Sequence, residues 1–217
     1  MKFLVTTILS TLLSLTTLAT AQYPDKIIFN GTEYNLDSNP LESYFEINLD
    51  KRPKGDLKST ALWRGYRATF EMRDSQLFVK DIQIQYLDTT DKNDQDIKWK
   101  SVMRDVFPDK VNVKVDWLSG LLVINFGKRV NYYATGYDSS FEQYLLLEID
   151  KGNYIKSKQY NDKEFESFKD RQFSAYKKTA DYRETKAKLE KDGSSDESTD
   201  NFLRSVVTKY TSKILTE

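Results

Sequence analysis

Residues 144–160 read YLLLEIDKGNYIKSKQY. Tyr144–Ile149 has the aromatic and aliphatic composition of a strand, and Tyr154–Tyr160 follows as a second strand. Lys151-Gly152-Asn153 lies between the two runs, and glycine supplies the backbone conformation that a tight turn needs. This stretch therefore predicts a β-hairpin.

The residues before this hairpin predict three more strands. Val111–Trp117 alternates apolar and polar residues, which is the period of a strand with one buried face. Ser119-Gly120 predicts a turn into Leu121–Phe126, whose nearly continuous apolar run indicates a central strand. Gly127-Lys128 predicts a further turn into a strand at Val130–Ala134.

Two more hairpins are expected nearer the N-terminus. Asn30-Gly31 is a strong hairpin signal, because both turn positions take positive φ angles, and it joins Ile27–Phe29 to Thr32–Leu36. The second hairpin comprises Ala61–Met72, a turn at Asp74-Ser75, and Gln76–Leu87.

Helices are expected where the apolar period lengthens and capping residues appear. Pro40 suits the first position of a short helix that ends near Asn48, and Trp99–Phe107 predicts another helix, stopped by Pro108. Residues 162–191 read as one long charged helix with an interrupted apolar face, and residues 200–215 as a last helix with a cleaner apolar face.

These elements predict an α+β protein. We expect an antiparallel meander sheet of about seven to nine strands, a short N-terminal helix and two C-terminal helices. Residues 22–160 would form a mainly antiparallel β domain. Residues 161–217 would form a helical segment packed on it, with a Gly/Ser/Asp linker at 192–199.

Residues 1–21 predict a secretory signal peptide. Lys2 precedes an apolar and hydroxyl-bearing run at Phe3–Leu18, and Ala19-Thr20-Ala21 has the small residues that a signal peptidase recognises, so cleavage is expected before Gln22. No later apolar run is long enough to span a bilayer. We therefore expect an exported, bacterial protein in the periplasm or the medium.

Two residue types are missing from the chain. It has no cysteine, so it forms no disulfide and lacks the residue that carries a lipoprotein anchor; it also has no histidine. Histidine-dependent triads and histidine-ligated metals are therefore excluded, and any acid or base must be Asp, Glu, Lys or Tyr. The net charge of zero gives no field for nucleic acid. We expect no cofactor and no metal.

Three sequence patterns are of types that can carry chemistry. Ser174-Ala175-Tyr176-Lys177 matches S-x-x-K, but its helix face is polar and its companion motifs are absent. The acidic stretch Asp88–Asp96 lacks the glycine and glutamate positions of a calcium loop. Paired carboxylates could make a glycosidase; the candidates are Glu71, Asp81, Asp116, Glu142 and Glu148.

Aromatic residues on or near the predicted strands are the remaining candidates. Exposed aromatic rings bind sugars or protein partners, whereas buried rings fill a core. Trp63 and Arg67 share a predicted strand face with Gly65, Thr69 and Glu71. We expect that face to be either exposed to water or covered by a partner. The predicted binding residues are Trp63, Tyr66, Arg67, Trp117, Tyr133 and Tyr137.

Three segments resemble a family of small exported or cell-associated bacterial proteins of unknown function. They are STALWRGY at 59–66, WLSGLLV at 117–123 and YLLLEIDKGN at 144–153. The resemblance implies a bacterial, single-domain protein and carries no activity, cofactor or catalytic residue. For such families an immunity-type role, in which the protein neutralises a partner, is conceivable.

The leading hypothesis is non-enzymatic binding of a protein partner or a polysaccharide through the aromatic-bearing sheet face. The alternatives are a carboxylate-dependent glycan hydrolase, an immunity-type protein, and an assembly component that docks through its C-terminal helix. The sequence carries no signal for the oligomeric state.

The signal peptide makes a direct prediction. When the whole chain is produced in a bacterial host, the exported form should begin at Gln22, and Ala19→Arg with Ala21→Arg should leave the chain uncut, because the peptidase needs small residues there. Intact mass and N-terminal sequencing measure both. An exported wild-type chain that retains residues 1–21 would contradict the prediction.

Overall fold

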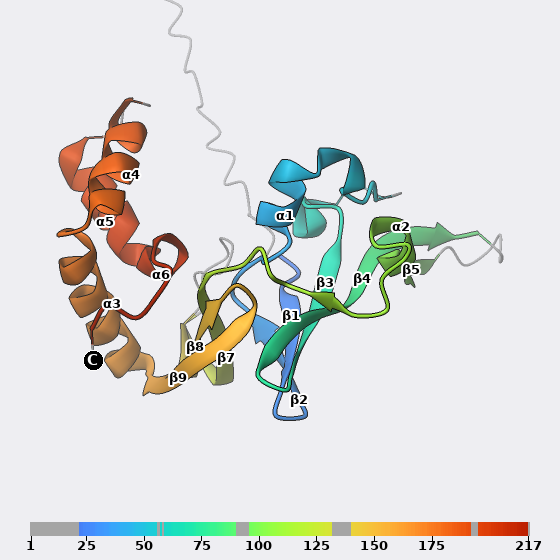
Figure 1. Cartoon of the computed structure of the whole chain (residues 1–217), viewed down its shortest axis with the longest axis horizontal. Coiled ribbons are helices and arrows are strands. Elements are labelled where there is room, and N and C mark those ends of the chain that lie inside the picture. The colour runs from blue at the N-terminus through green and yellow to red at the C-terminus, as the bar shows by residue number, and fades with distance from the viewer. Residues whose placement is uncertain are drawn as a thin grey trace, which may run out of the picture.

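The computed structural model describes residues 22–216, apart from 56, 58, 90–95, 132–139 and 192–194. This part of the chain is mixed α+β, with one nine-stranded, mostly antiparallel sheet and six helices (Figure 1). The strands are β1 Asp25–Phe29, β2 Thr32–Leu36, β3 Arg67–Arg73, β4 Gln76–Asp88, β5 Asp96–Ser101, β6 Val113–Lys114, β7 Gly120–Asn131, β8 Ser140–Asp150 and β9 Asn153–Asn161. The helices are α1 Glu42–Ile47, α2 Met103–Val106, α3 Asp162–Tyr176, α4 Ala180–Lys191, α5 Asp196–Ser205 and α6 Val207–Tyr210.

The sheet curls until its order returns to its first strand. The neighbours run β3-β1-β2-β7-β8-β9-β4-β5, and β3 also pairs with β4. Between β9 and β4 the pairing is a single residue pair, Asn153 with Gln76, so the ring closes at one end only. The predicted class and the predominantly antiparallel pairing are confirmed. The meander is not, because β1 and β3 are parallel and β2 pairs with the distant β7.

Three tight turns fold as their residues predict. Asn30-Gly31, Asp74-Ser75 and Lys151-Gly152 all have positive φ angles at both positions, which is the geometry of two-residue hairpin loops. Each joins antiparallel strands: β1 to β2, β3 to β4, and β8 to β9.

The β7–β8 hairpin is buried on both faces. Leu122, Ile124, Leu147 and Ile149 face the main core inside the curled sheet. The alternate residues Leu121, Val123, Tyr144 and Leu146 form a second core on the outer face with Phe165, Phe168 and Ile214. This two-sided burial explains the continuous apolar run at 121–126, as expected for a central strand.

The C-terminal helices differ from the expectation of two. The predicted helix 162–191 is interrupted at Lys177–Thr179 and forms α3 and α4. The Tyr182 N–H donates to Thr179 Oγ1, 3.1 Å away, at the start of α4. At this break the Tyr182 ring packs against Phe173 and Tyr176. The predicted helix 200–215 is likewise α5 and α6, and α5 begins at Asp196, inside the predicted linker.

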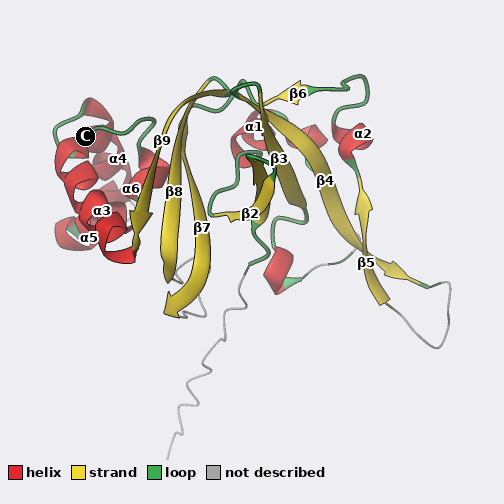
Figure 2. Cartoon of the chain, turned by 90° about the horizontal axis from the view of Figure 1, so that it is seen from below, coloured by secondary structure: helices red, strands yellow, loops and turns green. Residues whose placement is uncertain are grey.

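The helical segment lies at one end of the sheet (Figure 2). Phe165 and Phe168 of α3 bind it to the outer face of β7 and β8. Phe173, Tyr176, Tyr182, Leu203 and Val207 form a third, smaller core among the helices. None of the described helices combines the length and the apolar character that crossing a membrane requires.

The predicted helix at Trp99–Phe107 is wrong in its first half. Residues up to Ser101 belong to β5, and only Met103–Val106 is helical. The sequence places apolar residues at helical spacing here, but pairing with β4 overrides that local pattern.

Two glycines in equivalent turns should respond differently to alanine. A Cβ on Gly152 would lie 2.7 Å from the Val115 carbonyl oxygen, whereas a Cβ on Gly31 would meet nothing within 4 Å. Both have positive φ. We expect Gly152→Ala to cost about 3 kcal/mol of unfolding free energy and Gly31→Ala about 1 kcal/mol, since only the first adds a backbone clash. Urea denaturation measures both, and equal losses would contradict the prediction.

Candidate binding surface

Two of the six predicted binding residues fill the core. Tyr66 is fully buried and its hydroxyl donates to Glu42 Oε1 over 2.7 Å. Trp117 is half-buried; its Nε1–H donates to the Pro40 carbonyl over 2.9 Å, and its ring lies 4.8 Å from that of Tyr44. The ring of Tyr66 is closed to a surface ligand, which corrects the expectation for that residue, and the ring of Trp117 is only partly accessible. Tyr133 and Tyr137 lie outside the described residues.

Trp63 and Arg67 do reach the surface. Trp63 lies in the turn after the 3-10 helix Thr60–Leu62 and is 67% exposed. Arg67 opens β3, donates to Gln83 Oε1 over 2.8 Å, and places its guanidinium 4.2 Å from the centre of the Trp99 ring. Because β3 begins at Arg67, Trp63 does not share a strand face with it. Trp63 lies in a turn, and Arg67 lies four residues later on a strand.

Trp99, assigned to a helix by its sequence, is the centre of this surface. It lies on β5 opposite Gln85, and the Tyr23 ring meets it edge-on at 5.5 Å between ring centres. Two residues further along the ribbon, Ile97 pairs with Leu87. Residues two apart on a strand share a face, so both pairs lie on the face that carries Arg67.

We call this surface the ribbon patch. It comprises Tyr23, Trp63, Arg67, Leu87, Ile97 and Trp99. Ile97 is 59% exposed and Tyr23 is 41% exposed, so water covers apolar side chains over several neighbouring positions. Trp63 is included because its turn is tied to Tyr23: the Tyr23 N–H donates to the Ala61 carbonyl over 2.8 Å, two residues before Trp63.

The strand that carries Trp99 is at the edge of the sheet. In the part of the chain that the structure describes, β5 pairs only with β4, and the β4–β5 ribbon extends away from the rest of the sheet (Figure 2). An edge strand presents backbone groups that another strand can pair with. The ribbon patch thus combines an apolar face with an open backbone edge.

A buried ion pair anchors the patch from beneath. Arg64 Nη2 donates to the carbonyl of Tyr23 and to Asp25 Oδ1, each over 3.1 Å. Asp25 Oδ1 also accepts the Ala68 N–H over 2.9 Å. Asp25 and Arg64 are both buried. Since Arg64 follows Trp63 directly, this pair fixes the turn that exposes the tryptophan and the backbone that carries Tyr23.

The buried carboxyl of Asp25 has an altered acidity. Burial raises the pKa of Asp25 to about 6, although the charge of Arg64 and the Ala68 N–H act against the rise. Its second oxygen, Oδ2, has no hydrogen-bond partner among the described residues. Burial also disfavours the charge on nearby Glu42, but hydrogen bonds from Arg52 and Tyr66 outweigh it and lower the pKa of Glu42.

The S-x-x-K residues serve the structure. Ser174 Oγ donates to the Asp170 carbonyl over 2.9 Å, and Lys177 Nζ donates to Asp200 Oδ2 over 2.7 Å. Each side chain therefore has a partner other than its counterpart in the motif. The acidic stretch after Asp88 is only partly described, and no group of His, Cys, Asp or Glu in the described ranges could hold a metal ion.

The five carboxylates of the hydrolase hypothesis do not gather in one cleft. Glu142 and Glu148 are six residues apart on β8, or about 20 Å, which exceeds the 5–10 Å that glycosidases use. Glu142 accepts the Lys128 N–H and Glu148 the Ile214 N–H. Glu71 pairs with Lys80, Asp81 accepts from Ser101 Oγ, and Asp116 is exposed in a turn.

Comparison with known proteins adds no relative. No protein-family model matches the chain, and neither the characterised proteins nor the solved structures contain a match to it.

The raised pKa of Asp25 predicts a pH dependence of stability. Between about pH 4 and pH 6 the folded chain binds this proton more tightly than the unfolded chain, so the free energy of unfolding should fall as pH rises. A shift from 3.8 to about 6 corresponds to roughly 2–3 kcal/mol.

Asp25→Asn removes this titration and leaves that of Glu42 in place. Urea titration at each pH gives the unfolding free energies of the wild type and of this variant. The difference between them therefore isolates the contribution of Asp25 titration to stability. We expect the difference to fall up to about pH 6 and to stay level above it. A difference that rises with pH would show that the Arg64 charge outweighs burial.

Proposed function

We propose that this protein is an exported, non-enzymatic binding protein that recognises a protein partner through the ribbon patch. The exposure of neighbouring aromatic and aliphatic side chains around Arg67 and Trp99 carries the proposal. Tryptophan, tyrosine and arginine are the residues most often found at the energetic centre of protein interfaces. Burial of Trp63 and Ile97 by a partner would remove the apolar surface that water now covers.

The open edge of β5 favours a protein over a polysaccharide. A partner strand could pair with this edge while its side chains cover Ile97 and Trp99. Leu87 and Ile97 offer no ring face for a sugar to stack on. A polysaccharide remains an alternative ligand, since Trp63 and Tyr23 could stack on sugar rings. An immunity-type role would be one case of protein binding.

The glycan hydrolase is not favoured by the carboxylates. The candidates Glu71, Asp81, Glu142 and Glu148 each contact a different partner. Export rests on the pattern of residues 1–21 alone, and we propose it on that ground.

A double variant of the patch tests the proposal. Trp63→Ala with Ile97→Ser should weaken partner binding by about tenfold or more, because both side chains are exposed and would lie at the interface. The matched control is Val111→Ser, since Val111 is 95% exposed and lies outside the patch. Capture from the exported fraction of the producing cells, followed by titration of the captured protein, measures the effect.

Three outcomes would contradict protein binding at this patch. The first is capture that the double variant leaves undiminished. The second is binding on a glycan array that the double variant abolishes while no protein is captured, which would favour the polysaccharide. The third is release of sugars from a glycan, which would favour the hydrolase.

A further inference from the structure

Strand β9 leaves one edge open at the end of the molecule away from the ribbon patch. It pairs with β8 from Asn153 to Asn161, whereas on its other side the described residues offer only the single pair with Gln76 of β4. β4 and β9 diverge from that point (Figure 2). From Ile155 onward β9 therefore has one strand neighbour and one edge without a described strand.

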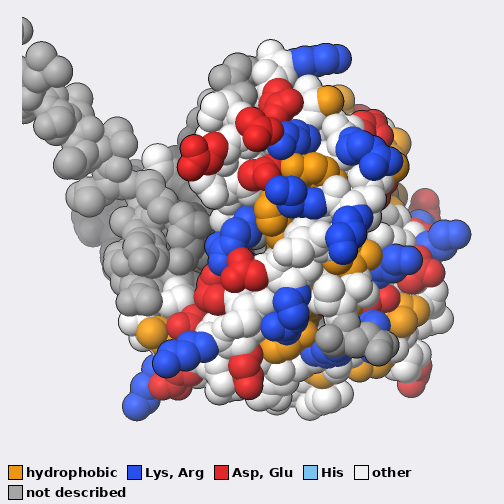
Figure 3. Space-filling view, turned by 90° about the vertical axis from the view of Figure 1, so that its left-hand side faces the viewer, with side chains coloured by type: hydrophobic (Ala, Val, Ile, Leu, Met, Phe, Trp, Pro, Cys, Tyr) orange, Lys and Arg blue, Asp and Glu red, His pale blue; other side chains and the backbone are white. Residues whose placement is uncertain are grey.

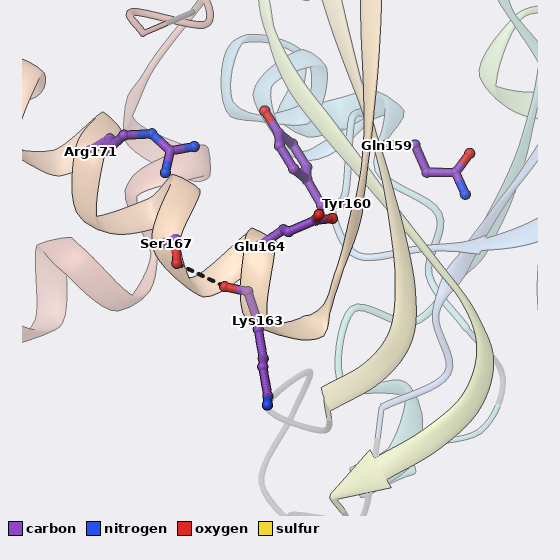
Figure 4. A pocket seen from close by; sticks show the side chains of 6 residues that line it. All are labelled: Gln159, Tyr160, Lys163, Glu164, Ser167 and Arg171. Atoms are coloured by element: carbon purple, nitrogen blue, oxygen red, sulfur yellow. Dashed lines mark hydrogen bonds between the residues drawn. The ribbon is translucent and has the colours of Figure 1, made fainter.

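Helix α3 forms a groove beside this strand. A cavity of about 510 Å³ is lined by Gln159 and Tyr160 of β9 and by Lys163, Glu164, Ser167 and Arg171 of α3. Figure 4 shows Arg171 and Tyr160 facing each other across it, while Lys163 extends away from them near the start of the helix. A strand edge next to a helix is the arrangement in which extended peptides bind by strand addition.

The groove carries an excess of positive charge. Lys163 and Arg171 of the lining contribute two cations. Lys158 of β9 lies outside the lining but on the same strand face as Tyr160. None of the three forms an ion pair with a described carboxylate, whereas on the same helix Lys169 pairs with Glu166. The one acid in the lining, Glu164, accepts the Asn161 N–H in the capping box.

This charge is local to the groove. Over the whole end of the molecule acidic and basic side chains are interspersed with apolar ones (Figure 3). Some basic residues of the helical segment have acidic partners, as Lys177 has Asp200 and Arg204 has Asp170. The whole chain has a net charge of zero, so the unpaired cations beside β9 do not reflect a general positive field.

We propose that this groove binds an extended acidic peptide segment of a partner protein, added as a strand to the edge of β9. The acidic side chains would pair with Lys158, Lys163 and Arg171, and the backbone would pair with β9. In a second copy paired antiparallel about Ser157, Lys156 would face Lys158 of the other copy, and like charges across a strand pair repel. The site is separate from the ribbon patch, so a test that contradicts one of the two proposals leaves the other unaffected.

Lysines and β-bulges also protect edge strands against pairing with other chains. Strand β9 has both features, because it carries lysines and its register with β8 shifts at Ile155. Protection alone would predict no binding of any peptide. Strand addition predicts binding that depends on the peptide's charge and on one set of its backbone N–H groups.

The test uses a fluorescently labelled peptide of alternating Glu and Val with nine residues, which is the length of β9. Fluorescence anisotropy measures its binding to the mature full chain. Two further peptides carry N-methyl groups on alternate residues, each set on one edge of the strand. Because alternate N–H groups of a strand point to opposite sides, one methylated peptide should bind as the parent does, and the other about tenfold more weakly or worse.

Charge-reversed variants complete the test. Lys163→Glu with Arg171→Glu should weaken binding by about tenfold or more. Arg183→Glu with Lys188→Glu, the same charge change on exposed positions of α4, should leave it unchanged. Circular dichroism checks that both variants remain folded.

Any of three results would overturn the proposal. They are equal binding of the two methylated peptides, equal binding of a Lys/Val peptide, and no binding of the acidic peptide at about 1 mM, a concentration that detects even weak association.

Discussion

The two-sided burial of the β7–β8 hairpin is the constraint on which the rest of the structure depends. Leu122 and Leu147 need the curled sheet on one side, and Leu121 and Leu146 need a cover on the other. Fully burying one such side chain stabilises a protein by about 1.5–3 kcal/mol. Removing α3 would expose several of them together. The helical segment is therefore part of the folding unit of the sheet, even though its own small core lies beyond it.

Several charged groups hold this arrangement together. Asp200 links α5 to α3 and α4 through Lys177, Tyr182 and Lys186, and Glu148 holds the C-terminal segment through the Ile214 N–H. A chain without histidine has few groups left for acid–base chemistry. Two surfaces that the described residues leave open are the apolar ribbon patch and the cationic groove beside β9, and these are the surfaces that we propose for recognition.

Local signals in the sequence were sufficient for the hairpins and insufficient for the site. Asn30-Gly31 and Lys151-Gly152 specify turns through φ angles that depend on those residues alone. The sequence predicts a helix at Trp99, because the pairing with Gln85 that makes it a strand residue is not a local signal. The burial of Tyr66 and Trp117 is equally non-local, since it comes from α1 and from residues next to α1 in the chain. The two-residue period of a strand separates exposed from buried faces only when the strand boundaries are right, and β3 begins four residues after Trp63.

The contrast between Trp63 and Arg64 bears most directly on function. The tryptophan is 67% exposed, while the arginine beside it is 5% exposed and paired with a buried aspartate. This is the inverse of the usual placement, because burying an indole is favourable, whereas the cost of desolvating a buried ion pair often exceeds the attraction between its charges. The ion pair holds the turn with its tryptophan outward. Such an inversion lowers the stability of the isolated chain, and a partner that covers Trp63 would recover the apolar burial that the fold forgoes.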